Sequence, residues 1–219
     1  MNVFKFGGAS VKDANGVKNL AKALKKVGYK NTLIVVSAMG KTTNAIERVI
    51  DDYFNNRAQL QSAIQEVKKF HNAILIDLFE NENHAVYNKV TKLFAELEAF
   101  LNNNKSPDYN FVYDQTISYG ELISTTIISA YLDDVGLKNT WLDIRDFIKT
   151  DNYYRSANVN WEATQKLITS KIDSKVLSVT QGFIGSDSNN FTTTLGREGS
   201  DYTAAILAYC LNAESVTIW

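Results

Sequence analysis

The sequence predicts an α/β fold, a three-layer αβα sandwich with a mainly parallel central sheet and a helical insert. Short runs such as "TLIVV" are apolar at every position, which is typical of parallel strands buried on both faces. These runs alternate with segments of helical periodicity, and residues 45–136 show helical periodicity alone. A chain of 219 residues with 45% hydrophobic residues is large enough to bury a substantial core.

The first elements are a strand, a glycine turn and a helix. Residues 3–6 form an apolar strand that "GG" interrupts, and an amphipathic helix follows. Asp13 is a suitable N-cap for this helix, and Gly28 is a suitable stop. The run "TLIVV" then predicts a second strand that leads into "SAMGKTTN".

The predicted insert, residues 45–136, carries two apolar stripes at helical spacing. The first stripe comprises Leu60, Ile64, Val67, Phe70, Ile74 and Leu78, and the second comprises Val90, Leu93, Leu97 and Phe100. Pro107, the only proline, marks a loop before a further helix that contains "ISYGELISTTIISAYL".

Strands return in the last third of the chain. "NTWLDI" and "KVLSVTQGFIG" read as strands with a helix over residues 161–172 between them, and "GFIGSDSNNFTTTL" predicts a hairpin. A helix over 200–211 and a strand over 216–219 follow. Because the sequence stops inside an apparent strand, we expect an incomplete domain, with part of the binding site beyond Trp219.

Composition excludes several classes of protein. The net charge of -1 lacks the basic excess of a nucleic-acid binder, so we expect small molecules or proteins as partners. Neither a signal peptide nor an apolar run of about 18 residues is seen, so we expect no membrane contact and a cytoplasmic location. Cys210, the only cysteine, is expected in the core. His71 and His84 have no metal-ligand spacing, so no metal ligands are predicted.

The first motif with chemical potential is "VFKFGGASV". Gly7, Gly8 and Ser10 lie where a strand gives way to a helix, so their backbone N–H groups can approach an anion closely. Lys5 can add a positive charge for a phosphate. A Gly-Gly turn that merely reverses the chain is the simpler alternative.

The second motif, "SAMGKTTN", follows the second strand. Gly40 permits close approach, and the polar side chains of Ser37, Thr42, Thr43 and Asn44 are donors or helix caps. Capping explains one of these four residues, although a polar loop is an alternative for the whole cluster.

The third motif, "SYGEL", places Glu121 in an apolar helix. An unpaired buried carboxylate is costly, so Glu121 should face solvent, a cation or a substrate amine. A solvated helix position is the simplest of these interpretations.

The richest motif is "TTTLGREGSD". Thr192–Thr194 offer hydroxyls, Arg197 offers a planar fork for a carboxylate, and Ser200 and Asp201 stand at a helix start. Asp201 has the alternative role of an N-cap or dipole partner. A substrate with both carboxylate and phosphate would use all these groups, and phosphoryl transfer requires mainly alignment and charge neutralisation by lysines, backbone amides and magnesium.

These four motifs, in this order, resemble the aspartate kinases of the amino-acid kinase superfamily, whose fold is carbamate kinase-like. The resemblance implies transfer of the γ-phosphoryl group of ATP, with Mg²⁺, to the side-chain carboxylate of L-aspartate, the first step of lysine, threonine and methionine biosynthesis. It implies that Lys5 and Asp201 are catalytic and that Lys5, Gly7, Gly8 and Ser10 bind the cofactor. The implied substrate-binding residues are Ser37, Thr43, Glu121, Arg197 and Ser200.

The sequence departs from the pattern of the family at two positions. Glu198 replaces the first glycine of the usual "LGRGGSD", which would strain the backbone and add a carboxylate near anions. Ala9 stands where threonine is frequent. By the same resemblance, we expect the rest of the kinase domain and the regulatory ACT domains to lie outside this sequence. We therefore expect little activity and a monomer or weak association for this chain, and a homo-oligomer at full length. A glutamate 5-kinase-like enzyme and a non-catalytic amino-acid-binding module are the alternatives.

Overall fold

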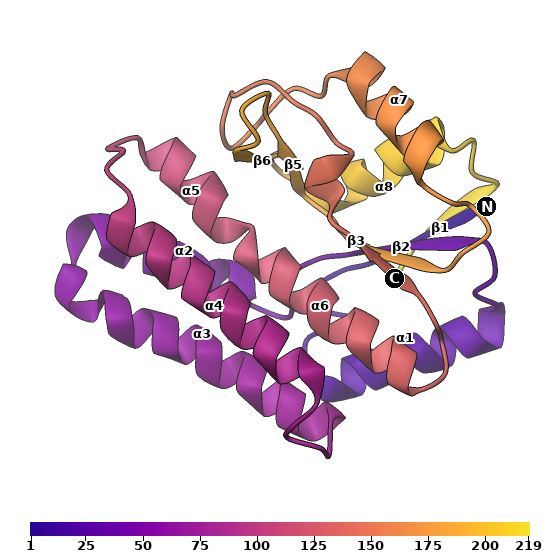
Figure 1. Ribbon diagram of the computed structural model, residues 1–219, viewed down its shortest axis with the longest axis horizontal. Coiled ribbons are helices and arrows are strands. Elements are labelled where there is room, and N and C mark those ends of the chain that lie inside the picture. The colour runs from indigo at the N-terminus through magenta and orange to yellow at the C-terminus, as the bar shows by residue number, and fades with distance from the viewer.

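A computed structural model describes all residues, 1–219, and has a five-stranded parallel sheet at its centre (Figure 1). The strand order is β3-β4-β2-β1-β7, so β1 lies between β2 and β7. The bounds are β1 Asn2–Phe6, β2 Thr32–Val36, β3 Thr140–Leu142, β4 Ser178–Gln181 and β7 Ser215–Ile218. Because all five strands are parallel, their carboxyl ends meet at one edge of the sheet, where ligands of open α/β folds bind.

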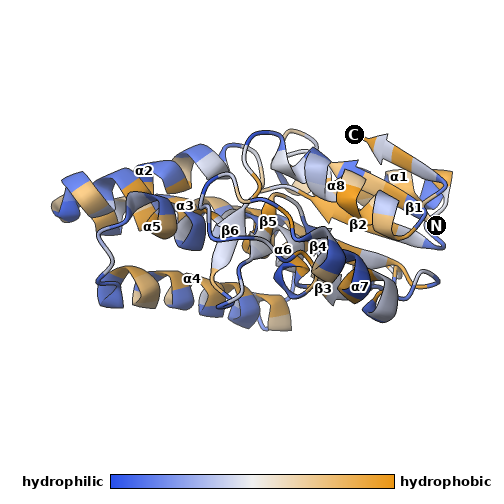
Figure 2. Cartoon of the chain, turned by 90° about the horizontal axis from the view of Figure 1, so that it is seen from above, coloured by the Kyte–Doolittle hydropathy of each residue, from blue (hydrophilic) through white to orange (hydrophobic).

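Helices cover both faces of this sheet, which confirms the predicted sandwich. Alternate residues of β1 enter opposite cores: Phe4 packs in a core with α1 (Ala14–Val27) and α6 (Tyr119–Asp134), whereas Val3 packs in a second core with α8 (Gly199–Cys210). α7 (Trp161–Lys171) contacts α8 on the outer side. The strands of the sheet are largely hydrophobic, as expected for a sheet buried on both faces (Figure 2).

The predicted ends of the first helix agree with the structure. The side chain of Asp13 accepts a hydrogen bond from the N–H of Gly16 at 2.8 Å, which caps α1. Gly28 ends α1 with φ 95°, in a region of backbone angles that favours glycine.

A group of helices extends to one side of the sheet (Figure 1). It consists of α2 Thr42–Asn55, α3 Arg57–Leu78, α4 Ala85–Asn103 and α5 Tyr109–Ile117, followed by α6. The apolar stripe of α3 differs from the prediction at Phe70, which is 37% exposed. The fully buried position in that turn belongs to His71, because the buried face follows the spacing Val67, His71, Ile74.

The run "KVLSVTQGFIG" holds two strands rather than one. β4 ends at Gln181, and β5 (Ile184–Ser186) pairs antiparallel with β6 (Thr192–Thr194), which confirms the predicted hairpin. Gly182, between the two strands, lets the chain pass close to the start of α8, because a Cβ atom there would lie 2.6 Å from the Cβ of Ser200. A 3-10 turn, η1 (Ile144–Asp146), packs against β5. No helix has the length and apolar character that a membrane span requires.

Candidate functional site

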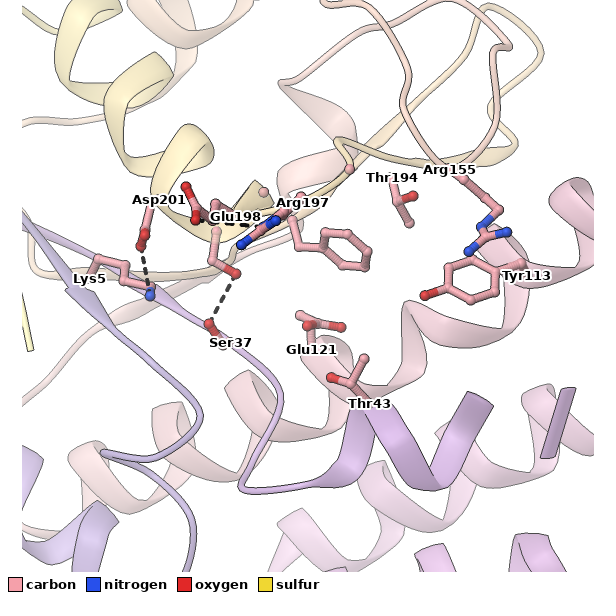
Figure 3. A pocket seen from close by; sticks show the side chains of 14 residues that line it. Lys5, Ser37, Thr43, Tyr113, Glu121, Arg155, Thr194, Arg197, Glu198 and Asp201 are labelled. Atoms are coloured by element: carbon pink, nitrogen blue, oxygen red, sulfur yellow. Dashed lines mark hydrogen bonds and ion pairs between the residues drawn. The ribbon is translucent and has the colours of Figure 1, made fainter. Parts of the chain in front are cut away.

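A cavity of about 470 Å³ lies beyond the carboxyl ends of the strands (Figure 3). Segments far apart in sequence line it, from β1, α2, α5, α6, the loop around residue 155, β6 and α8. Its polar lining includes Lys5, Ser37, Thr43, Tyr113, Glu121, Arg155, Thr194, Arg197, Glu198, Ser200 and Asp201. The structure thus brings the predicted catalytic and substrate-binding side chains to one place.

Lys5 and Asp201 form an ion pair at one end of this cavity. The Nζ atom of Lys5 lies 2.7 Å from Oδ1 of Asp201, and the lysine side chain is only 13% exposed (Figure 3). Lys5 occupies the penultimate position of β1, and Asp201 lies in the first turn of α8. The N-cap position of α8 belongs to Glu198, so Asp201 is directed to the lysine rather than used as a cap. A partly buried lysine held in this way is a fixed positive charge.

The glycine turn after β1 lies beside the cavity rather than on its lining. The N–H of Gly7 donates to the carbonyl of Trp219 at 3.2 Å, and the N–H of Ser10 donates to the carbonyl of Gly7 at 2.9 Å. A Cβ atom on Gly7 would lie 3.4 Å from Nζ of Lys5, and one on Gly8 would lie 2.7 Å from the carbonyl oxygen of Ala38. Glycine is therefore required at position 8, where the turn after β1 packs closely against the turn after β2. At Gly7, the turn after β1 lies next to the ammonium group of Lys5.

The "SAMGKTTN" segment divides into structural and cavity-facing residues. The Ser37 hydroxyl lies 3.0 Å from that of Ser200, which joins the ends of β2 and α8 inside the cavity. Thr43 also lines the cavity. The buried Thr42 hydroxyl donates to the carbonyl of Met39 at 2.6 Å, and Asn44 is exposed away from the cavity. The N-cap position of α2 belongs to Lys41, which makes no side-chain cap, so the predicted capping role is wrong. Thr42 is used inside the protein, whereas Ser37 and Thr43 face the cavity.

Glu121 is buried, so the interpretation of a solvated helix position is wrong. Its side chain is 4% exposed, and Oε1 accepts the N–H of Ala38 at 3.2 Å. Oε2 is buried without any hydrogen-bond partner, and burial raises the pKa of this carboxyl to about 8. The apolar helix predicted around Glu121 is what forces this burial. A carboxylate oxygen that lines a cavity without a partner is suited to receive an ammonium group.

The three threonine hydroxyls of β6 are used within the protein. Thr192 accepts from Arg145 at 3.1 Å, Thr193 pairs with Thr150 at 2.7 Å, and Thr194 donates to Asp114 at 2.8 Å. Of the three, only Thr194 lines the cavity. The sequence could not distinguish structural from ligand-facing hydroxyls, because their partners lie far along the chain.

The segment at Arg197 and Glu198 forms the open mouth of the cavity. The Arg197 side chain is 95% exposed, and its Nε lies 3.9 Å from Oε1 of Glu198. Glu198 has φ 57° and ψ 23°, which is the left-handed conformation that its replacement of a glycine predicted. The arginine is thus free to move toward a ligand, with only a loose contact to an exposed carboxylate.

The sequence analysis missed Tyr113, Arg155 and Phe183 as cavity residues. The Arg155 guanidinium lies over the ring of Tyr113, 4.5 Å from its centroid, and the Tyr113 hydroxyl donates to Glu47 at 2.9 Å. Burial raises the pKa of Tyr113 above its usual value. These residues come from a helix and two loops that share no local motif, so only the tertiary structure reveals them.

The histidines and the cysteine lie outside this site. His71 is fully buried, and burial lowers its pKa to about 4. His84 accepts the N–H of Val86 at 3.1 Å and so caps α4. Cys210 is a buried core residue, and burial raises the pKa of its thiol. No group of three or more His, Cys, Asp or Glu side chains is arranged to hold a metal ion.

Comparison with known proteins places the chain in a family. Residues 1–219 match the amino acid kinase family. Lysine-sensitive aspartokinase 3 of Escherichia coli is 32% identical over 228 residues, covering 99% of this chain and 48% of that protein. Bifunctional aspartokinase/homoserine dehydrogenase 2 of Arabidopsis thaliana, chloroplastic, is 30% identical, covering 100% of this chain and 24% of that protein.

Solved structures agree with this comparison. E. coli aspartokinase III in complex with aspartate and ADP, in the R-state, matches with a TM-score of 0.90 and 28% identity, covering 100% of this chain and 48% of that one. The aspartate kinase of Clostridium acetobutylicum has the same fold, with a TM-score of 0.80 and 22% identity. This chain spans about half the length of the E. coli enzyme. The match along all of its residues means that the chain belongs to the amino acid kinase family.

Proposed function

We propose that this chain carries the acceptor and phosphoryl-transfer site of an aspartate kinase. The reaction transfers the γ-phosphoryl group of ATP to the side-chain carboxylate of L-aspartate and gives 4-phospho-L-aspartate and ADP. The observation that carries this proposal is the single cavity that contains both the Lys5–Asp201 pair and the open carboxylate oxygen of Glu121. The similar E. coli protein was solved with aspartate and ADP, which supports the choice of both ligands.

The acceptor amino acid needs three kinds of contact, and the cavity offers each. The unpartnered oxygen of Glu121 suits the α-ammonium group, and the Arg197 guanidinium suits the α-carboxylate. Ser37, Thr43 and Ser200 supply hydroxyls along the same cavity. With its amino end held by Glu121, the acceptor directs its side-chain carboxylate toward Lys5.

Phosphoryl transfer from ATP to a carboxylate needs little proton movement. An oxygen of the acceptor carboxylate forms a bond to the γ-phosphorus, and the bond from that phosphorus to the bridging oxygen of ADP breaks. Lys5 neutralises charge on the moving phosphoryl group, and Asp201 holds the lysine in place at 2.7 Å. The turn of Gly7, Gly8 and Ser10 lies beside Lys5. The N–H groups of Gly7 and Ser10 donate to backbone carbonyls, so we propose that the N–H of Gly8 and the Ser10 hydroxyl face the phosphates.

Magnesium is part of the proposal as a companion of the nucleotide. Mg²⁺ is commonly held by one or two carboxylates together with substrate phosphates and water, and it neutralises phosphate charge. Asp201, in the first turn of α8, is a carboxylate that lines the cavity beside Lys5. The site therefore fits a cation that arrives with ATP.

The experiment is trapping of the acyl phosphate. The folded 219-residue chain, and the complete product of its gene, are incubated with MgATP, hydroxylamine and either L-aspartate or L-glutamate, and hydroxamate is measured. We expect aspartyl hydroxamate, and its loss by about a hundredfold or more in Lys5→Met, because the charge next to the phosphoryl group disappears. Lys26→Met is the matched control, since Lys26 is an exposed residue near the end of α1 and lies outside the cavity.

Other outcomes identify the alternatives. Glutamyl hydroxamate as the main product would indicate a glutamate 5-kinase-like enzyme. No product from either folded protein, together with measurable amino-acid binding that persists in Lys5→Met, would indicate a non-catalytic binding module.

A further inference from the structure

A second buried carboxylate, Asp114 on α5, lies behind the wall of the cavity. Its side chain is completely buried and does not line the cavity. Oδ2 accepts the backbone N–H of Thr194 at 2.8 Å and that of Arg155 at 3.0 Å, and Oδ1 accepts the Thr194 hydroxyl at 2.8 Å. A buried carboxylate is tolerated when it is hydrogen-bonded, and Asp114 receives three donors from two distant segments.

The next residue of α5, Gln115, also binds the β5–β6 hairpin. The Gln115 side chain donates to the carbonyl of Thr192 at 2.7 Å and accepts the N–H of Thr192 at 3.1 Å. One edge of β6 pairs with β5, and the other edge is therefore paired with two consecutive side chains of α5. Asp114 and Gln115 take the place of a third strand, which satisfies an edge that would otherwise be open.

Both segments that Asp114 holds belong to the cavity wall. Thr194 and Arg155 line the cavity directly, and Arg197 follows Thr194 after a single turn through Gly196, which has φ 78°. Arg155 has φ 70°, a left-handed conformation that is unfavourable for a residue with a side chain. The hydrogen bond from its N–H to Asp114 anchors this conformation, and the guanidinium rests on Tyr113 (Figure 3).

We infer that Asp114 is a positioning residue for the amino-acid acceptor: it fixes the wall formed by Arg155 and Thr194, and through that wall the start of the Arg197 segment, without touching the substrate. This inference rests on the proposed function. The Lys5 end of the cavity comes from β1 and α8, which Asp114 does not contact through hydrogen bonds. Loss of Asp114 should therefore weaken acceptor binding and leave the Lys5–Asp201 pair in place.

The test compares Asp114→Ala with Asp114→Asn. The asparagine oxygen can still accept both backbone N–H groups, and its NH₂ can donate to the Thr194 hydroxyl, so Asn preserves the wall. Alanine leaves all three donors without a partner. Asp52→Ala is the matched control, because Asp52 is also a buried carboxylate but lies on α2, outside the cavity.

Two measurements are made on each variant. Calorimetric titration with L-aspartate should show affinity reduced by about tenfold or more in Asp114→Ala, and within about threefold of wild type in Asp114→Asn and Asp52→Ala. Amide hydrogen exchange at Arg155 and Thr194 should accelerate in Asp114→Ala alone. If Asp114→Ala does not fold, Thr194→Val removes the hydroxyl bond to Oδ1 of Asp114, so that carboxylate is held less firmly. The backbone amide of residue 194, which donates to Oδ2, should then exchange faster than in the wild type.

Each contrary result has a distinct meaning. Unchanged exchange at Arg155 and Thr194 in folded Asp114→Ala, or in Thr194→Val where that variant stands in, would overturn the positioning role. So would an aspartate affinity equal to that of wild type. The wild-type chain could also fail to bind aspartate while exchange at Arg155 and Thr194 accelerates in Asp114→Ala as predicted. That result would overturn the proposed function and the role of Asp114 in acceptor binding, but Asp114 would still be shown to fix Arg155 and Thr194.

Discussion

Asp114 and Glu121 are buried carboxylates on consecutive helices, yet their surroundings differ. Asp114 accepts three hydrogen bonds from the protein, whereas Glu121 accepts one main-chain N–H from Ala38 and leaves Oε2 without a partner. Burial raises the pKa of both, to about 6 for Asp114 and about 8 for Glu121. The difference separates a carboxylate that its own chain saturates from one that keeps an oxygen without a partner beside the cavity.

The largest expected effect is a difference in the free energy of unfolding when each of the two carboxylates is replaced by leucine. Asp114→Leu removes three hydrogen bonds and leaves buried N–H groups unpaired, so we expect a loss of about 3 kcal/mol in the free energy of unfolding. Glu121→Leu replaces a buried carboxyl group, whose Oε2 has no partner, by an apolar side chain and removes one hydrogen bond, so its unfolding free energy should be unchanged or higher. Urea unfolding at pH 7 measures both. Equal losses in the two variants would break the comparison.

The next effect concerns the ligand. Glu121→Gln keeps the size of the side chain but removes the charge that we propose for the substrate ammonium group, so L-aspartate affinity should fall by about 30-fold to 100-fold, or about 2 to 3 kcal/mol. Asp114→Asn, the same chemical change at the saturated site, is the control and should alter affinity by about threefold at most. Calorimetric titration measures the affinity. If Glu121→Gln changed it only slightly, the ammonium group of the substrate would have to bind another residue.

A pH dependence sharpens the comparison further. Because the pKa of Glu121 is raised to about 8, the folded protein holds this proton more tightly than the unfolded chain does, and stability falls as pH rises toward 8. Between pH 6.5 and 7.5, above the pKa of about 6 for Asp114, the unfolding free energy should fall by about 1 kcal/mol per pH unit. Glu121→Gln should abolish this fall and leave a small rise with pH, because burial lowers the pKa of His71 to about 4 and the unfolded chain still binds part of that proton near pH 6.5. A fall that persists in that variant would point to another group.

The smallest effect concerns a third carboxylate, which is exposed. Glu198 adopts a left-handed conformation with φ 57°, and its side chain makes only a 3.9 Å contact with Arg197. Glu198→Gly should relieve the backbone strain and raise the free energy of unfolding by about 1 kcal/mol. Glu198→Ala is the control, since alanine removes the carboxylate but keeps the strain. Thermal unfolding of both variants decides whether the backbone or the charge matters.

Local signals in the sequence were sufficient for much of this structure. The apolar runs predicted the parallel strands, and Asp13 and Gly28 predicted the ends of α1, because caps and stops act within a few residues. The same motifs pointed to Lys5, Glu121 and Asp201, which the fold gathers in one cavity. Sequence reasoning failed where the partner is distant in the chain.

The Asp114 site illustrates that failure. Its donors, Arg155 and Thr194, lie 41 and 80 residues away, so no window of sequence shows that the carboxylate is satisfied. The burial of Glu121 was misjudged for a related reason, since it depends on contact with the turn that holds Ala38. The position of Phe70 depends on which residue of α3 faces the neighbouring helices. His71 takes that position, and its Nδ1 donates to the carbonyl of Val67 at 2.8 Å.

The place of β1 in the sheet has a consequence for biosynthesis. β1 is made first but lies between β2 and β7, and Lys5 on β1 meets Asp201 only after α8 exists. At about 5–20 residues per second, a ribosome needs roughly 10 to 45 seconds to make a chain of this length. During that interval one edge of β1 has no partner strand, and such edges can pair with other chains. Until β7 and α8 have been made, the nascent chain therefore has an open edge on β1 and lacks the Lys5–Asp201 pair, and slower synthesis prolongs this state.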